Sequence, residues 1–340
     1  MEYTRLGATD ITIPRLCIGG MSFGRVFPDF HQWVIDQPAT QAVIARALEL
    51  GVNFIDTANV YAHGTSEEFI GQSLKNLGVN REDVVLASKV YFNEGHLSRR
   101  AIEREITATL GRLGTDHLDL YIIHRFDYDT PVEETMEALD ALVRGGRVRA
   151  IGASAMYAYQ LHTMQVVADG HGWTRFASMQ NHYNLLYRED EREMIPVCRR
   201  YGMSLTPYSP LASGHLARPD WDADSVRATT DVTMRSKYDR EREADLPIVA
   251  RVAELAARRG VPMADIALAW HWAKGGAAPV VGCSRPGRVD DAVRALDVRL
   301  TADEVARLEE PYRPHELVGP LVRPDEGALA GTVQEPPKRS

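Results

Sequence analysis

The chain has 340 residues, a net charge of -8 at neutral pH, 44% hydrophobic residues and 25% charged residues. This composition is typical of a globular protein, and the length suits one large α/β domain or two smaller ones. Lysine and arginine are scattered, which disfavours a nucleic-acid or anionic-membrane partner. No apolar run has the length of a membrane span, and the first residues lack a signal-peptide core. We therefore expect a cytoplasmic protein, and the sequence is compatible with a homo-oligomer.

The three cysteines, Cys17, Cys198 and Cys283, lie far apart and are odd in number. This spacing argues against a disulfide framework and against a CxxC-type zinc site. We expect reduced, mostly buried thiols and no metal site.

A short hairpin is predicted around GATD (7–10), and eight apolar runs rich in β-forming residues follow it. Each run is short enough to be a strand and apolar enough to be covered on both faces. The runs are PRLCIGG (14–20), VNFIDTA (52–58), DVVLASKV (83–90), LDLYIIHR (118–125), VRAIGAS (148–154), FASMQNHY (176–183), MSLTPYSP (203–210) and APVVGCS (278–284).

Helical patterns separate these runs. Ser66 is the expected N-cap of one helix, with acidic residues after it that suit the helix dipole, and Pro131 is expected in the first turn of another. The expected helices are Pro38–Leu50, Ser66–Leu77, Ser98–Leu113, a helix from Thr130 onward, Tyr157–Ala168, Glu189–Tyr201, Pro247–Arg259, Met263–Lys274, Arg288–Leu296 and Thr301–Glu310.

Strands that alternate with helices eight times predict right-handed βαβ units, and eight such units can close into a (β/α)8 TIM barrel. A doubly wound open sheet is the alternative, but no strand leads into a G-x-G-x-x-G turn. We predict an α/β protein with one barrel domain over residues 1–313, an N-terminal hairpin and long loops at the C-terminal face.

Two segments interrupt this alternation. Residues 211–246, here called the lid segment, form a long charged stretch, and loops of this length in compact barrels are usually functional. The tail over residues 314–340 has little apolar periodicity and is expected to fray beyond about Arg323.

Polar residues follow several of the predicted strands, where a barrel of this kind carries its working residues. The run VNFIDTANVY (52–61) stops at Asp56, which is costly to bury unpaired, and Tyr61 comes five residues later. Asp56 can alternatively cap a turn through Thr57. Lys89 and His124 end the next two strands. Taken alone, Lys89 is equally well explained as a solvent-exposed lysine, and His124 as a histidine hydrogen-bonded in the core. Together the four form a proton-donor site, because a nearby ammonium stabilises a phenolate.

The motifs VNFIDTANVY, ASKV and YIIHR at these intervals resemble the aldo-keto reductase family, and the resemblance extends to about Tyr312. The family's Asp, Tyr, Lys and His tetrad maps onto the four residues above. The stretch SMQNHYNLLYREDEREMIPVC (178–198) also resembles bacterial members that reduce aldehydes and ketones. The resemblance implies an extended nicotinamide dinucleotide without a Rossmann domain, hydride transfer to a carbonyl carbon, and Tyr61 as the proton donor.

The resemblance also implies cofactor contacts. Ser154 and Gln180 would hydrogen-bond the carboxamide and Tyr208 would stack on the nicotinamide, although the first two can alternatively just close strand ends. The remaining expected contacts are Ser209, Leu211, Ser213, Gly214, Gly282, Ser284, Arg285, Arg288 and Asp291. Arginines near the ribose phosphate favour NADPH over NADH, since guanidinium pairs bidentately with phosphate. Many members have Glu and Asn at positions 291 and 292 and Asn at 155, so binding looser than typical is expected.

Residues in loops at the mouth are the candidate substrate contacts. They are Met21, Phe23, Tyr91, Phe92, Arg125 and Phe126. This lining would accept a carbonyl on a hydrophobic or modestly anionic body; alternatively, the residues only pack the loops. The insertion GRVFPDFHQWVIDQ (24–37) adds Phe27, Phe30 and Trp33, which either wall the pocket or pack over the barrel.

The sequence thus predicts an NADPH-dependent oxidoreductase (EC 1.1.1.-) that reduces a small aldehyde or ketone, sugar-derived or aromatic. An NADPH-binding regulatory subunit with little turnover is the alternative. An aldolase or isomerase with a Schiff base on Lys89 is a third hypothesis, but it leaves Tyr61 and the arginines near residue 285 unexplained.

Overall fold

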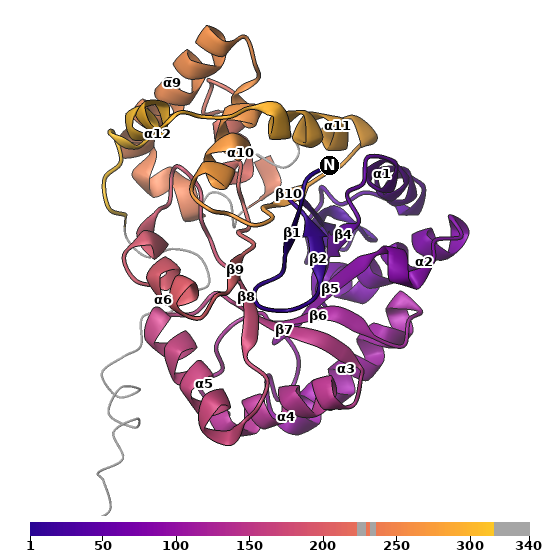
Figure 1. Ribbon diagram of the computed structural model, residues 1–340. Helices are drawn as coiled ribbons and strands as arrows, with labels where there is room; N and C mark the ends of the chain where they lie inside the picture. The colour runs from indigo at the N-terminus through magenta and orange to yellow at the C-terminus, as the bar shows by residue number, and fades with distance from the viewer. Residues whose placement is uncertain (223–228, 232–235, 316–340) are drawn as a thin grey trace, which may run out of the picture.

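The computed structural model describes residues 1–222, 229–231 and 236–315, and its main sheet has eight parallel strands with helices around it (Figure 1). The strands pair in the order β10-β3-β4-β5-β6-β7-β8-β9. Their bounds are β3 (Cys17–Gly19), β4 (Phe54–Asp56), β5 (Val85–Val90), β6 (Leu118–Ile123), β7 (Val148–Ser154), β8 (Phe176–Gln180), β9 (Ser204–Leu205) and β10 (Val280–Gly282). All eight predicted strands form.

The sheet closes on itself. The first and last of its strands along the chain, β3 and β10, pair in parallel, with Cys17 opposite Val280. On the other side of β10, Tyr208 and Val280 form a parallel bridge, and the Val280 amide donates to the Pro207 carbonyl at 2.9 Å. An open doubly wound sheet would leave two free edges here. The predicted (β/α)8 barrel is therefore confirmed.

The expected helices are all present, with some boundaries moved. They are α1 (Gln37–Glu49), α2 (Thr65–Asn76), α3 (Arg99–Leu113), α4 (Val132–Arg144), α5 (Ala158–His171), α6 (Met194–Arg200), α9 (Arg242–Arg259), α10 (Met263–Ala273), α11 (Pro286–Arg294) and α12 (Ala302–Glu309). Ser98 caps α3, and Thr301 forms a capping box with Glu304 at the start of α12.

The predicted cap at Ser66 is wrong. Helix α2 begins at Thr65 after Gly64, and the buried Ser66 hydroxyl donates to the Gly20 carbonyl at 2.7 Å. The serine therefore ties the helix to the loop after β3, a contact that local pattern cannot reveal. Pro131 is the N-cap of α4 rather than part of its first turn.

Two other helix starts differ from the prediction. Helix α9 begins at Arg242, so Pro247 lies inside it. Residues Glu189–Glu191 form a separate 3-10 turn before α6. Glu189 accepts from the Tyr312 hydroxyl at 2.7 Å, and Glu191 accepts from Arg188.

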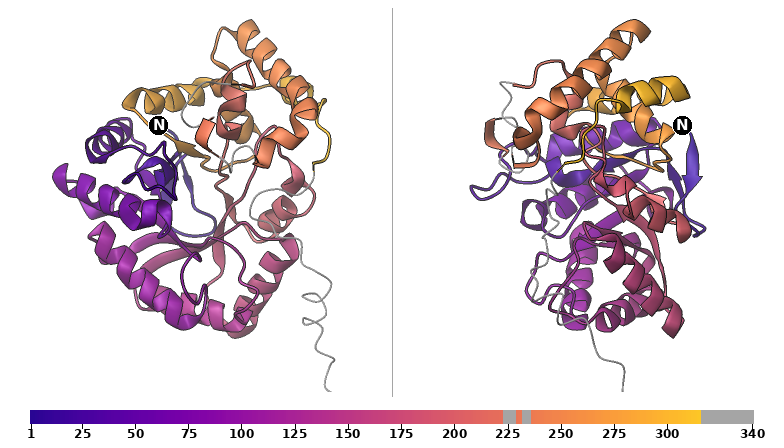
Figure 2. Two further views of the ribbon diagram at one scale, coloured as in Figure 1. Left: turned by 180° about the vertical axis from the view of Figure 1, so that it is seen from behind. Right: turned by 90° about the vertical axis from the view of Figure 1, so that its left-hand side faces the viewer.

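The N-terminal hairpin closes one end of the barrel. Strands β1 (Tyr3–Arg5) and β2 (Thr12–Pro14) pair antiparallel, as predicted. Leu6 and Ile13 are fully buried in a cluster with Phe54 and Leu120 from inside the sheet. In the side view of Figure 2, the indigo hairpin lies at one end of the barrel and long loops extend from the other. Access to the barrel interior is therefore from the loop end.

The described helices include none that is both long enough and apolar enough to cross a membrane. Cys17, Cys198 and Cys283 are buried free thiols, as expected. The expected fraying beyond Arg323 lies outside the described residues, and the domain limit at residue 313 stays a prediction.

Candidate active site

Three of the four tetrad residues form a chain of direct contacts at the loop end of the barrel. The Lys89 Nζ, fully buried at the end of β5, donates to Asp56 Oδ1 at 2.5 Å, to the Thr57 carbonyl at 2.8 Å and to the Tyr61 hydroxyl at 3.2 Å. The three ammonium protons thus each have an acceptor. Asp56 ends β4 as the ion-pair partner of Lys89, so the alternative that it caps a turn through Thr57 is not supported.

The second Asp56 oxygen is also bonded. The Gln180 Nε2, at the end of β8, donates to Asp56 Oδ2 at 3.0 Å. A carboxylate that is only 2% exposed is therefore satisfied on both oxygens, as a buried charge has to be. Gln180 was expected either to meet the cofactor carboxamide or to close a strand end, and its contact with Asp56 was not predicted.

Burial and charge act in opposite directions on the Tyr61 hydroxyl. Burial raises the pKa of Tyr61, the Lys89 ammonium lowers it, and the net shift is upward. The sequence predicted the effect of the ammonium, and the structure adds the opposing effect of burial. For Lys89, burial lowers the pKa, but Asp56 and Tyr61 outweigh it and the net shift is upward. The lysine therefore stays charged beside the phenol.

A tight turn holds Tyr61 toward the barrel axis. Ala62 and His63, directly after it, have φ angles of 46° and 54°, in the left-handed region. The loop after β3 packs on this turn: a Cβ at Gly24 would lie 2.5 Å from the Ala62 Cβ, so only glycine fits there. The Arg25 amide donates to Thr65 Oγ1 at 2.9 Å, which fixes the same loop to the start of α2.

His124, at the end of β6, faces the tyrosine ring edge-on, with centroids 5.7 Å apart. Burial lowers the pKa of His124 well below its usual value, and the nearby Lys89 and Arg125 charges act in the same direction. The imidazole is therefore neutral at physiological pH. Its Nδ1 is buried and has no hydrogen-bond partner among the described residues.

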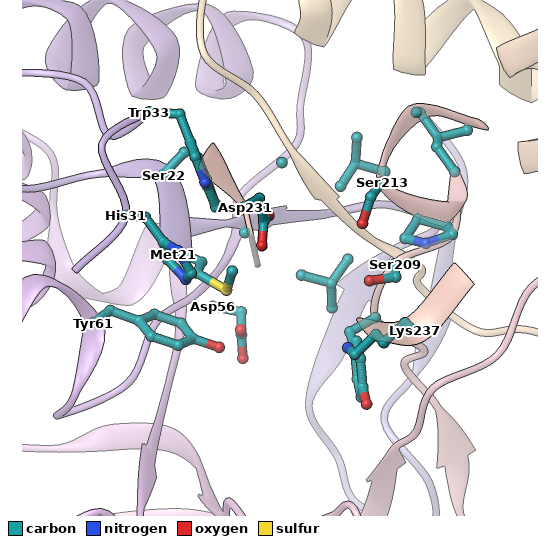
Figure 3. Close-up of a pocket in the computed structure, with 18 of the residues that line it drawn as sticks. Met21, Ser22, His31, Trp33, Asp56, Tyr61, Ser209, Ser213, Asp231 and Lys237 are labelled. Carbon is teal, nitrogen blue, oxygen red and sulfur yellow. The ribbon is translucent and has the colours of Figure 1, made fainter. Parts of the chain in front are cut away.

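The site opens into a cavity of about 920 Å³ at the loop end of the barrel. In the view of Figure 3, Met21, His31, Trp33 and Tyr61 lie on one side and Ser209, Ser213 and Lys237 on the other. Most residues expected to bind cofactor or substrate line it. They are Asp56, Tyr61, His124, Ser154, Gln180, Tyr208, Ser209, Leu211, Ser213, Gly214, Gly282, Ser284, Arg288, Asp291, Met21, Phe92 and Arg125.

Four expected contacts do not line this cavity. Phe23 is fully buried in the core between the sheet and the helices, which corrects its assignment to the substrate pocket. Tyr91 stacks on His96 with centroids 4.7 Å apart, and Phe126 packs against Tyr128. The fourth, Arg285, is the residue before α11. In the sequence, each of these four residues lies within one or two positions of a residue that lines the cavity. Sequence position alone therefore does not separate lining residues from their neighbours.

Several described residues of the lid segment line the cavity. Lys237 lies over the Tyr208 ring, with its Nζ 4.7 Å from the centroid, while His182 stacks on Tyr208 at 5.3 Å. Tyr238, the residue after Lys237, is buried and shares a 2.9 Å hydrogen bond with His182 Nε2. Sequence reasoning assigned function to the lid segment as a whole and missed these particular side chains.

Comparison with known proteins identifies the relatives of this chain. Residues 15–313 match the Aldo/keto reductase family. The chain belongs to the aldo-keto reductase family. It is 40% identical to versiconal hemiacetal acetate reductase from Aspergillus parasiticus, in an alignment that covers 93% of this chain and 98% of that protein. It is 39% identical to aldo-keto reductase AMT2 from Alternaria alternata, over 92% of this chain and 91% of that protein.

A third relative comes from Saccharomyces cerevisiae and carries the provisional name aryl-alcohol dehydrogenase AAD16. It is 38% identical, over 92% of this chain and 98% of that protein. All three relatives are fungal, whereas the resemblance noted in the sequence was to bacterial members. Membership of the aldo-keto reductases makes the chain an oxidoreductase for small carbonyl compounds, with a nicotinamide cofactor.

Proposed function

We propose that this aldo-keto reductase is a cytoplasmic, NADPH-dependent enzyme that reduces the carbonyl of a small aldehyde or ketone to an alcohol. The observation that carries the proposal is the contact chain from Asp56 through Lys89 to the Tyr61 hydroxyl, which ends at the cavity. When bound, NADPH supplies the hydride. Three free, buried cysteines suit a reducing compartment.

The side chains divide the acid–base work between them. The Tyr61 hydroxyl holds the proton that the substrate oxygen takes as negative charge develops on it. Lys89, 3.2 Å from that hydroxyl, stabilises the phenolate left behind, and Asp56 keeps the ammonium in place. The neutral imidazole of His124 orients the carbonyl oxygen by a hydrogen bond.

The cavity suits a long, anionic cofactor. Ser209, Ser213 and Gly214 have φ angles of 55°, 56° and 108°, so the chain after β9 turns repeatedly along one wall. Ser154 and Gln180 would hold the carboxamide and Tyr208 would carry the nicotinamide ring. Ser284 and Arg288 would hold the adenosine phosphate.

An aromatic substrate is the class that the mouth of the cavity favours. Phe30, Trp33 and Phe92 line it together with Met21. Arg125 lies over the Phe92 ring, with its guanidinium carbon 4.6 Å from the centroid, and adds a positive edge. One relative is named for an aryl alcohol. We therefore extend the proposal to aryl aldehydes and ketones, including those with an acidic substituent.

The test is a screen of purified protein with NADPH against aromatic, aliphatic and sugar aldehydes and ketones, followed by NADPH absorbance. We expect turnover that is highest with aryl aldehydes. NADPH binding with negligible turnover across the panel would support a regulatory subunit instead. Trapping of a lysine adduct by borohydride would support the Schiff-base hypothesis.

A further inference from the structure

The cavity is more basic than the protein around it. Its described lining includes five basic residues, Arg125, Arg218, Lys237, Arg240 and Arg288, and three acidic ones, Asp56, Asp231 and Asp291. Two of the acids are paired with basic residues outside the lining: Asp56 with Lys89, and Asp291 with Arg294 at 2.9 Å. The chain as a whole carries a charge of -8. A basic cavity in an acidic protein attracts an anion of several charges.

Arg218 is one of three members of this set, with Lys237 and Arg240, that sequence reasoning did not assign to the site. It follows the 3-10 segment Ala212–Ala217 in the loop after β9 and is partly buried. Its Nε is buried without a hydrogen-bond partner, and it pairs with none of the carboxylates in the described part of the chain. A partly desolvated guanidinium without an anion is costly, which indicates a ligand in this position.

The backbone of Gly214 sets where this guanidinium lies. A Cβ at Gly214 would come within 2.9 Å of Arg218 Nη1, and Gly214 has a φ of 108°. The arginine head therefore packs directly on the stretch expected to follow the pyrophosphate. It faces the same cavity as Arg288, which comes from α11.

The two arginines are close enough to repel each other. Burial lowers the pKa of Arg218, the charge of Arg288 lowers it further, and the Asp220 carboxylate acts in the opposite direction without reversing the shift. The two guanidiniums come from separate elements and face one cavity. A phosphate dianion bound between them would offset this repulsion. A phosphate monoester offers three oxygens, enough for two guanidinium forks.

We propose that Arg218 binds the cofactor 2′-phosphate opposite Arg288, so that the loop after β9 determines the preference for NADPH over NADH. This inference rests on the proposed function, because it requires a nicotinamide dinucleotide in the cavity. The pyrophosphate is the less suitable partner. Each of its phosphates carries a single negative charge, whereas the 2′-phosphate monoester is a dianion and is the better match for two guanidiniums.

The test is the dissociation constant of NADPH and NADH, measured from quenching of tryptophan fluorescence, since Trp33 lines the cavity. Arg218→Gln should weaken NADPH binding roughly tenfold or more and NADH binding by less than about twofold. Displacement by 2′,5′-ADP and 5′-ADP should show the same difference. Arg200→Gln removes the same charge from an exposed position on α6 and should change neither constant.

Arg218→Lys keeps the charge but loses the fork, and should bind NADPH between the wild type and Arg218→Gln. In the double variant Arg218→Gln/Arg288→Gln, the dissociation constant of NADPH should rise by less than the product of the two single-variant factors, because both residues contact one phosphate. Unchanged NADPH binding, or equal losses for NADPH and NADH, would overturn the inference. If Arg218→Gln does not fold, the lysine variant decides in the same way. A wild type that binds neither dinucleotide would contradict the proposed function itself.

Discussion

Asp56 shows how a buried charge is accommodated in this protein. One of its oxygens meets Lys89 and the other meets Gln180, and these partners come from two other strands. Removing either partner would leave the carboxylate partly unpaired at a site that is almost fully buried. The contacts therefore fix Lys89 in the one position from which it also reaches the Tyr61 hydroxyl.

The first prediction concerns that hydroxyl. Tyr61→Phe removes the proton donor and keeps the ring that packs near Lys89 and His124. We expect the turnover number to fall by roughly a hundredfold or more, because general acid catalysis contributes that much. The dissociation constant of NADPH should change by less than about twofold. Steady-state kinetics and a fluorescence titration measure the two effects, and a variant with wild-type turnover would rule out Tyr61 as the donor.

At the scale of elements, the loop between β8 and α6 is hydrogen-bonded, through Asn181, to the cavity-lining residue Tyr208. Asp190 in this loop accepts from Asn181 Nδ2 at 2.6 Å, and the Asn181 carbonyl accepts from the Tyr208 amide at 2.9 Å. Burial raises the pKa of Asp190 to about 7, and the Asn181 hydrogen bond opposes the shift. The folded protein therefore holds a proton that the unfolded chain releases near pH 4.

This difference gives stability a dependence on pH. Because the folded pKa of Asp190 is the higher one, its stabilising contribution is complete below about pH 4 and is lost as the pH rises through about 7. Asp190→Asn should remove this loss and raise the free energy of unfolding by roughly 1 to 2 kcal/mol at about pH 8, with little change at about pH 4. Urea denaturation at several pH values measures it.

The matched control is Asp129→Asn, which changes the charge equally at an exposed position. A difference between Asp190→Asn and wild type that stays the same from about pH 4 to about pH 8 would contradict the assigned pKa.

At the scale of the whole molecule, the two ends of the barrel have different tasks. The hairpin seals one end, and the loops of the other end surround the cavity. In barrels of this type the first end contributes stability and the second carries the site. Asp119 near the start of β6 belongs to the sealed end. It accepts from Arg81 at 2.6 Å, from Arg149 at 3.0 Å and from the Leu86 amide at 2.8 Å.

Asp119→Ala should therefore separate stability from binding. The change leaves two arginines and a buried amide without their acceptor, and we expect the free energy of unfolding to fall by about 3 kcal/mol. The NADPH dissociation constant of the folded variant should match the wild type. Asp119→Asn, which keeps an acceptor for Leu86, should lose less. Weakened cofactor binding in a variant of full stability would show that the two ends are not independent.

The alternation of strands and helices was readable from the sequence, because each element needs its own periodicity of apolar residues to be buried. The positions of Asp56, Tyr61, Lys89 and His124 after strands were readable too, since parallel strands end at one edge. Their contacts with one another agree with that expectation, while their catalytic roles stay a proposal.

Other features were decided only by tertiary structure. Ser66 bonds across to Gly20, Phe23 turns into the core, and Arg218 reaches the cavity that Arg288 lines. Local periodicity reports which residues are buried but not which distant segment covers them. The sequence by itself determined the barrel, the strand ends and the family. The folding of the loops over the barrel decided which side chains share the cavity, because those contacts join residues far apart in the chain.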